Sequence, residues 1–172
     1  MKSEIEERAV FVSFCIEQYA KAKNMPTEDV VNLFGKYELT EYLCEFYDEL
    51  HTHGHNWLIE EIDEMIDRGI KDIQISGSIS ISHRKGVDRH KVHRINRNKA
   101  MSAPITQDNL YLLLPCKIGW LARWMVEDND ISIAEAINRI YHSKLYKKLS
   151  SESTKYWHLG PVDLYNELKQ EL

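Results

Sequence analysis

Proline and glycine are scarce in this chain, with only four and seven of them among 172 residues. A collagen-like or low-complexity protein would contain many more, and 43% hydrophobic residues is too high a fraction for a disordered protein. The composition therefore indicates an ordinary globular protein.

Long hydrophobic runs are also missing. The best candidates, residues 9–16 and 110–116, are much shorter than the ~18 to 20 residues that a membrane-spanning helix requires. Acidic side chains outnumber basic ones by three to two in the first eight residues, whereas a secretory signal or transit peptide would be basic. We therefore expect a cytoplasmic protein that does not cross a membrane.

Cysteine is too sparse for a disulfide scaffold. Cys15, Cys44 and Cys116 are odd in number, lie far apart and are surrounded by apolar residues. This pattern predicts reduced thiols that pack as small hydrophobic side chains.

Charge divides the chain into three parts. Residues 1–68 hold 6 Lys and Arg against 16 Asp and Glu, residues 69–100 hold 8 against 2, and residues 101–172 hold 8 against 9. Helix-forming amphipathic sequence stops and returns at nearly the same places. We therefore predict a first cassette (1–68), a basic connector (69–104) and a second cassette (105–172).

Both cassettes show the periodicity of helices. In the first, an apolar stripe covers much of the circumference of one segment, which predicts a central, well-buried helix. The stripe consists of Ile5, Ala9, Val12, Ile16 and Tyr19, with Phe11, Phe14 and Cys15 widening it. After Pro26 a short helix is expected to end at Gly35 through a left-handed cap.

The second cassette repeats this helical character. Asp108 is expected to cap a helix over residues 109–127, and Ser132 with Glu135 has the spacing of a capping box. In the connector, isoleucines alternate with polar residues over 72–82, a strand-like pattern. The predicted fold class is all-α, two small helical bundles joined by a basic connector with room for one short strand or weak hairpin.

A histidine cluster is the most chemical-looking feature of the chain. His51 and His55 have the spacing of two ligands on one helical turn, but Gly54 interrupts that turn and no third ligand is specified nearby. We expect His51 and Gly54 to shape a helix end. No nucleophile, phosphate-loop or dinucleotide motif is present, so the sequence predicts no enzyme, no cofactor and no metal.

Aromatic residues suggest a binding role instead. Core packing explains most of them, but a bundle of about seventy residues can bury only a few such rings, and surplus rings on an acidic surface favour docking to a partner protein. The candidate partner-binding residues are Tyr42, Phe46, Tyr47, Trp57 and Trp157.

The basic connector gives an alternative function. Its Lys and Arg residues could attract nucleic acid without sequence preference, although the acidic first cassette would oppose a polyanion. The candidate nucleic-acid-binding residues, within Arg84 to Lys99, are Arg84, Lys85, Arg89, Lys91, Arg94 and Arg97.

Four elements of the first cassette carry a resemblance. They are residues 11–19, residues 30–34, Tyr42-Leu43 with Tyr47, and Leu50-His51-Thr52-x-Gly54 followed by Ile59 and Ile62. Together they resemble a short bacterial family of proteins named domain of unknown function 3791, over about residues 8–68. In residues 106–172, the pattern Ile140-Tyr141-x-Ser143-x-x-Tyr146 with Trp157-His158-Leu159-x-Pro161 is similar to a second, related-looking short bacterial helical protein.

The resemblance implies a binding protein. Members of such families are often encoded beside proteins similar to ADP-ribosyltransferases, in an arrangement typical of toxin and antitoxin, and no catalytic residues are assigned to them. The expected function is therefore a protein interaction module, antitoxin-like, whose acidic helical surface masks a basic or cofactor-binding face of an enzyme resembling an ADP-ribosyltransferase.

Overall fold

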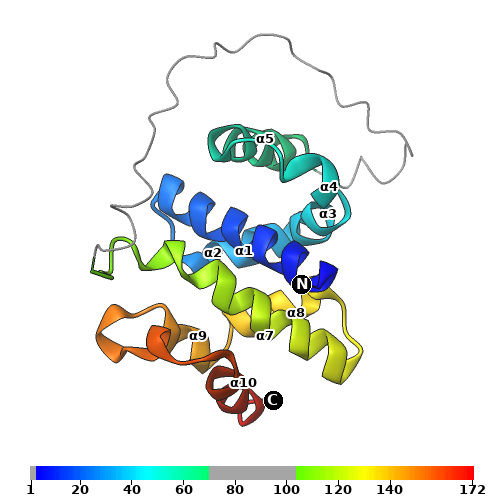
Figure 1. The fold of residues 1–172 in the computed structure, drawn as a ribbon. Coiled ribbons are helices and arrows are strands. Elements are labelled where there is room, and N and C mark those ends of the chain that lie inside the picture. Colours follow the sequence, from blue (N-terminus) through cyan, green and yellow to red (C-terminus); the bar gives the residue numbers. More distant parts are fainter. Residues whose placement is uncertain (1–2, 70–103) are drawn as a thin grey trace.

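A computed structural model describes residues 3–69 and 104–172 (Figure 1). The predicted strand or hairpin and the six candidate nucleic-acid-binding residues, Arg84, Lys85, Arg89, Lys91, Arg94 and Arg97, lie outside the described residues. We refer to residues 3–69 as the first half and to residues 104–172 as the second half.

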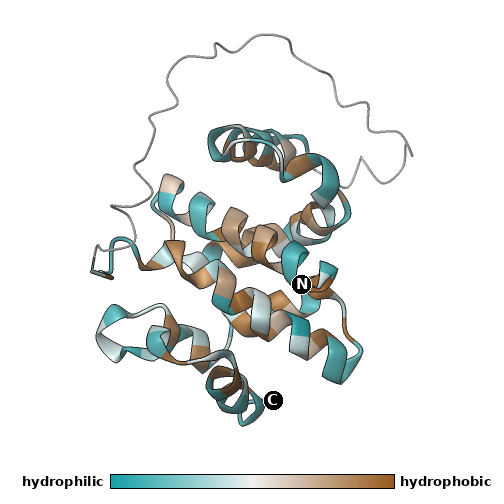
Figure 2. Ribbon diagram, in the orientation of Figure 1, coloured by the Kyte–Doolittle hydropathy of each residue, from teal (hydrophilic) through white to brown (hydrophobic). Residues whose placement is uncertain are grey.

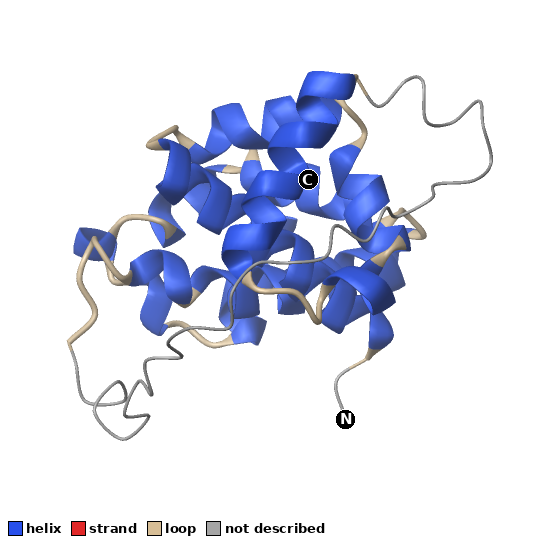
Figure 3. Cartoon of the chain, turned by 90° about the horizontal axis from the view of Figure 1, so that it is seen from above, coloured by secondary structure: helices blue, strands red, loops and turns tan. Residues whose placement is uncertain are grey.

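The described residues form helices joined by short loops, and no strand occurs among them (Figure 3). The predicted all-α class is therefore confirmed. The first half contains α1 (Glu4–Lys23), α2 (Thr27–Lys36), α3 (Leu39–Glu45), α4 (Tyr47–Leu50) and α5 (His55–Arg68). The second half contains η2 (Leu110–Leu112), α7 (Leu114–Asn129), α8 (Ile133–Tyr141), α9 (Lys144–Leu149), η3 (Glu152–Thr154), η4 (Tyr156–His158) and α10 (Pro161–Lys169).

Helix α1 is the central element. It packs against α2, α3 and α5 of its own half, and its most extensive contact is with α7 of the second half, which runs beside it (Figure 1). Hydrophobic residues gather where α1, α7 and α8 run past one another (Figure 2). The sequence leaves open whether the two cassettes pack on each other, and the structure shows that they do, with one continuous hydrophobic core.

Two polar caps define the ends of α1. The Ser3 hydroxyl accepts a hydrogen bond from the backbone amide of Glu6 at 3.2 Å, and Asn24 adopts a left-handed conformation at the other end. Both are favourable helix-terminal arrangements. Between these caps, Ala9, Val12 and Ile16 are completely buried, as the apolar stripe predicts.

The two sides of α1 face the two halves of the protein. Residues 8, 11, 15 and 19 lie toward the first half, where Phe11 packs on Tyr47 and Tyr19 packs on Phe34. Residues 6, 10, 13 and 17 lie toward the second half, where their partners include Arg123, Gly119 and Tyr141. The helix is therefore buried on most sides, because helices approach it from two directions.

The closest approach of α1 and α7 occurs at Gly119. A Cβ atom at this position would lie 2.3 Å from Cγ2 of Val10 and 3.3 Å from the backbone oxygen of Glu6. With Val10 in place, a side chain at position 119 would force these two helices apart.

Two helix boundaries differ from the prediction. Helix α2 continues through Gly35 to Lys36, and the left-handed residue is Glu38 (φ 56°), because the turn is placed just before the fully buried Leu39. Asp108 does not begin a helix through residues 109–127. Pro115 lacks an amide hydrogen and belongs in a first turn, so a 3-10 turn precedes α7 and the helix begins at Leu114.

Candidate functional site

A cleft of about 560 Å³ lies where the two halves meet. We call it the junction cleft. Three segments line it, namely α1, the region from α4 to α5, and the region from η2 to the start of α7. The lining residues are Glu7, Val10, Phe11 and Phe14 from α1, Tyr47, His51, His53, His55 and Leu58 from the second segment, and Leu112, Pro115 and Cys116 from the third. Its volume is within the usual range of ligand-binding pockets in proteins.

Tyr47 forms an aromatic wall of the cleft. Its ring meets Phe11 edge-on at 5.4 Å between centroids and stacks on the His51 imidazole at 4.5 Å. The Arg8 guanidinium lies 5.4 Å from the same ring, and Arg8 also donates hydrogen bonds to the Cys44 carbonyl and the Asp48 carboxylate. The wall is therefore held in place by packing and a charged group before any ligand arrives.

The Leu-His-Thr-x-Gly element forms the second side of the cleft. Leu50 is buried at the end of α4, and the His51 ring nitrogen Nδ1 lies 2.7 Å from the Tyr47 carbonyl. Thr52 donates to the Glu49 carbonyl at 3.1 Å, and Gly54 precedes the first residue of α5 in an extended conformation. His51 and Gly54 thus lie at helix ends, while the imidazoles that this turn presents line the cleft.

Trp57 adjoins the cleft through a histidine. Its indole stacks on the His53 imidazole with centroids 3.9 Å apart, and His53 lines the cleft. Tyr47 and Trp57 therefore lie at or beside the cleft, and their role in binding stays a prediction.

Tyr42 and Phe46 make a neighbouring pair. Their rings lie 4.6 Å apart, and Tyr42 is buried at the side of α3. Tyr42 is thus mainly a packing residue, with Phe46 half-buried beside it.

Carboxylates impose a negative potential on this side of the molecule. Burial raises the pKa of Tyr47 above its ordinary value of 10, and Glu7 and Asp48 raise it further against the opposing effect of Arg8. Burial likewise raises the pKa of Tyr42, with added contributions from Glu61 and Glu49. Negative charge near a phenol opposes its ionisation, so the raised pKa values of both tyrosines partly reflect the carboxylates around them.

Trp157 lies in another part of the fold. It belongs to η4, which packs with α9 and η3, well away from α4 and α5 (Figure 1). Its indole nitrogen donates to the Glu152 carbonyl at 3.2 Å, and Lys155 lies 5.8 Å from the ring centroid. The predicted partner-binding residues therefore do not form one surface.

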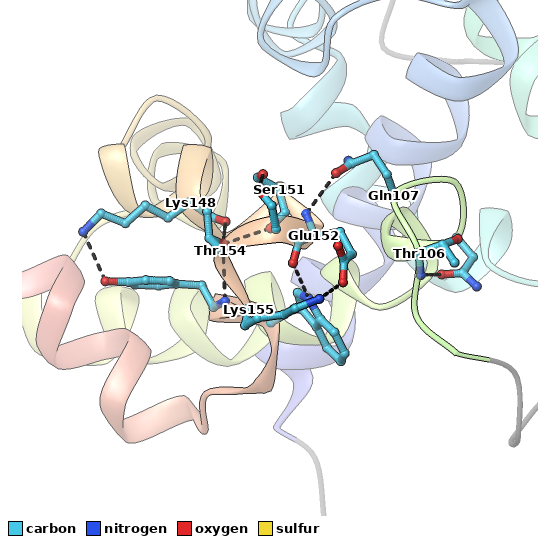
Figure 4. A network of polar contacts seen from close by, with 11 residues as sticks. Thr106, Gln107, Lys148, Ser151, Glu152, Thr154 and Lys155 are labelled. Atoms are coloured by element: carbon cyan, nitrogen blue, oxygen red, sulfur yellow. Dashed lines mark hydrogen bonds and ion pairs between the residues drawn. The ribbon is translucent and has the colours of Figure 1, made fainter.

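A polar network fixes the segment that carries Trp157 (Figure 4). Gln107 donates to the Ser150 carbonyl at 2.9 Å and accepts from the Glu152 amide at 2.9 Å, while Lys148 reaches the Tyr156 hydroxyl at 3.3 Å. From α7, the buried Lys117 donates to the Leu159 carbonyl at 2.7 Å. These contacts attach the loop to the helices behind it, which is a structural role.

The described residues show no assembled metal centre. Across residues 3–69 and 104–172, no three His, Cys, Asp or Glu side chains are grouped so that they could hold a metal ion. The three cleft histidines are among the residues searched, and this geometry gives the hypothesis of a shared metal at His51 and His55 no support.

The thiols of Cys15 and Cys44 are poor nucleophiles. Burial raises the pKa of Cys15 far above its ordinary value and that of Cys44 to about 12, so both remain protonated thiols at neutral pH. All three cysteines are free, as expected.

Several residues of the cleft were missed by sequence reasoning. Glu7, Val10, Leu112 and Pro115 come from segments that were assigned to separate cassettes. Leu112 keeps 58% of its surface exposed at the cleft. Only the packing of η2 and α7 beside α1 brings these residues to the His-containing turn.

The comparisons with known proteins identify one segment. Residues 10–68 match the family model described as protein of unknown function, DUF3791. The match covers α2 to α5 and most of α1, including Tyr47 and the Leu-His-Thr-x-Gly element. No curated protein and no solved structure matches the chain. In the described part of the chain, none of the helices combines the length and apolar character needed to cross a membrane.

Proposed function

We propose that this protein is an interaction module that binds a partner protein at the junction cleft. The observation that carries the proposal is the exposed Leu112 beside a preformed wall of Tyr47 and Phe11. An apolar side chain of a partner could enter between them and bury surface on both sides. Buried aromatic residues contribute much of the binding energy of many protein interfaces.

Charge supports a basic partner. Glu7 lines the cleft and Asp48 lies close enough to raise the pKa of Tyr47. Over residues 1–68, acidic residues outnumber Lys and Arg by 16 to 6. Such an excess accelerates encounter with a positively charged segment and disfavours acidic ones. We infer an occupant with an apolar anchor residue flanked by Lys or Arg.

The resemblance noted in the sequence suggests where this occupant would come from. A partner encoded beside the protein and similar to an ADP-ribosyltransferase would be masked by binding, which is the antitoxin-like form of the proposal. In that form this chain supplies the binding surface and the partner supplies the chemistry.

Co-expression with the product of the neighbouring gene tests the proposal. We expect the two proteins to co-purify, and Leu112→Arg to weaken the complex about tenfold or more, which corresponds to roughly 1.4 kcal/mol. The substitution removes the apolar contact and opposes a basic partner. Since Leu112 is exposed, the variant should keep the stability of the wild type in urea unfolding.

Val162→Arg provides a matched control. Val162 is 60% exposed on α10, almost the same exposure as Leu112, but it does not line the cleft. Binding of this variant should stay within about twofold of the wild type. Failure to co-purify, or equal losses for both variants, would contradict the proposal.

A further inference from the structure

A buried carboxyl group joins the two halves on the side of α1 that faces α8 and α9. Glu17 is only 4% exposed, and its Oε1 accepts hydrogen bonds from the hydroxyls of Tyr141 at 3.1 Å and Tyr146 at 2.8 Å. Tyr141 has one hydroxyl proton and donates it to Glu17, so Ser13 donates to Tyr141 over their 2.6 Å contact. Thr27 of α2 also hydrogen-bonds to Tyr146.

Glu17 has no positively charged partner among the described residues. None of the ion pairs found in residues 3–69 and 104–172 includes it. The groups that face it from α8 and α9 are the two tyrosines, and burial keeps both of these neutral by raising their pKa values. Several charged groups on neighbouring elements have other partners. On α7, Arg123 pairs with Glu6 and Glu127, and Lys117 donates to the Leu159 carbonyl. On α5, Asp63 contacts Tyr19 and Lys23, and at the end of α8, His142 contacts Asn32.

Glu6 shows what an ion pair adds in the same setting. It lies on the same stripe of α1 and is 5% exposed, but its carboxylate is 3.5 Å from the Arg123 guanidinium of α7. The two carboxyl groups are thus similarly buried, but of the two only Glu6 has a positively charged partner among the described residues. An isolated buried charge costs several kcal/mol, and a carboxyl group avoids this cost by binding a proton.

The pKa of Glu17 agrees with this geometry. Burial raises it from the ordinary value of 4.5 to about 7, against the lowering effect of the hydrogen bonds from Tyr146 and Tyr141. Oε1 accepts both hydroxyls in either protonation state, so the bound proton belongs on Oε2.

We propose that Glu17 is a proton-sensitive latch between the two halves of the protein. In its protonated state it fastens α8 and α9 to α1 through Tyr141 and Tyr146. Ionisation places an uncompensated charge in this contact and weakens it. The latch is distinct from the junction cleft and does not depend on the proposed partner.

The sign of the pH effect follows from the two states. Because the folded protein binds the proton more tightly than the unfolded chain, the stabilisation is complete below about pH 4.5, falls as pH rises toward 7 and is absent above it. Between pH 5 and pH 8, the unfolding constant of the wild type should therefore increase about 70-fold relative to Glu17→Gln, whose amide does not titrate.

Urea unfolding of the full chain at several pH values measures this ratio. Glu6→Gln is the matched control, since it removes a buried carboxyl group of α1 that is already paired with Arg123. Its unfolding constant should run parallel to that of the wild type over this pH range. Amide hydrogen exchange, corrected for its intrinsic pH dependence, should show faster opening of α8 and α9 at pH 8 than at pH 6 in the wild type, and no such change in Glu17→Gln.

A direct titration keeps the proposal testable if Glu17→Gln does not fold. The side-chain carboxyl carbon of Glu17, followed by NMR in the wild type, should titrate with a midpoint near neutral pH. A midpoint at or below the ordinary glutamate value would overturn the proposal. Parallel stability curves for the wild type and Glu17→Gln, or equal α8 and α9 opening at both pH values, would do the same.

Discussion

Replacing Gly119 by alanine tests how closely the two halves of the protein pack. In a helix interior this change alone would stabilise the protein by about 1 kcal/mol, because alanine favours helix more than glycine does. Here the new Cβ would lie 2.3 Å from Cγ2 of Val10. Valine is restricted to few rotamers in a helix, so α1 and α7 must separate, and overpacking of this kind costs about 1 to 3 kcal/mol.

We expect Gly119→Ala to destabilise the protein by about 1 to 2 kcal/mol, measured by urea unfolding with far-UV circular dichroism. Val10→Ala should itself cost about 1 kcal/mol through lost packing. In the double variant the new Cβ would lie 3.5 Å from the Cβ at position 10, an ordinary contact, and 3.3 Å from the Glu6 backbone oxygen, a tight contact. Adding Gly119→Ala to Val10→Ala should then cost less than adding it to the wild type, because the shortest contact, with Cγ2 of Val10, is gone.

The denaturant dependence provides a check on this cycle. All four proteins should unfold with similar m-values, which report the surface exposed on unfolding. An equal loss from Gly119→Ala in both backgrounds would refute the reasoning, because it would show that contact with Val10 is not what limits the space at this position.

Three other substitutions have defined outcomes. Ser132→Ala removes the side chain that caps α8 at 3.1 Å and should lower the free energy of unfolding by about 1 kcal/mol in a thermal melt. Lys117→Met leaves the Leu159 carbonyl without its donor and should cost about 1 to 3 kcal/mol, with faster amide exchange in residues 150–160. Tyr146→Phe removes a hydrogen bond that lowers the pKa of Glu17, so an NMR titration should show its midpoint moving up from about 7.

The helices and most of the core followed from local sequence. Apolar residues on nearly every side of residues 5–19 required a central helix, and the structure buries that helix on both sides. Caps such as Ser132 were also predictable, because the side chain and the amide that it caps are three residues apart. Helix ends set by tertiary packing, such as the turn at Glu38, were not.

The junction cleft could not be assembled from the sequence. Phe11, Tyr47 and Leu112 belong to segments up to about a hundred residues apart, and no periodicity records that α7 runs beside α1. Residue type alone points to Trp157, and it cannot distinguish a surface ring from one that fixes a loop.

The burial of Glu17 is predictable from the sequence. A helix with apolar residues around most of its circumference leaves little solvated surface for polar side chains on it, so those side chains must find partners in the protein. That argument could have marked Ser13 and Glu17 as buried. It could not have named Tyr141 and Tyr146, which lie more than 120 residues away.

The first half of the protein should depend on the second half for its stability. The matched residues 10–68 contain most of α1 but neither α7 nor α8, which cover one side of it. A chain of about sixty residues buries only about 60% of its surface when folded, so exposing this side should leave residues 1–69 marginal on their own. We expect this fragment to self-associate or to unfold without cooperativity, and to recover a cooperative transition when residues 104–172 are co-expressed with it. Circular dichroism and light scattering would measure both. A monomeric 1–69 fragment as stable as the full chain would mean that contact with the second half adds nothing to the folding of the first.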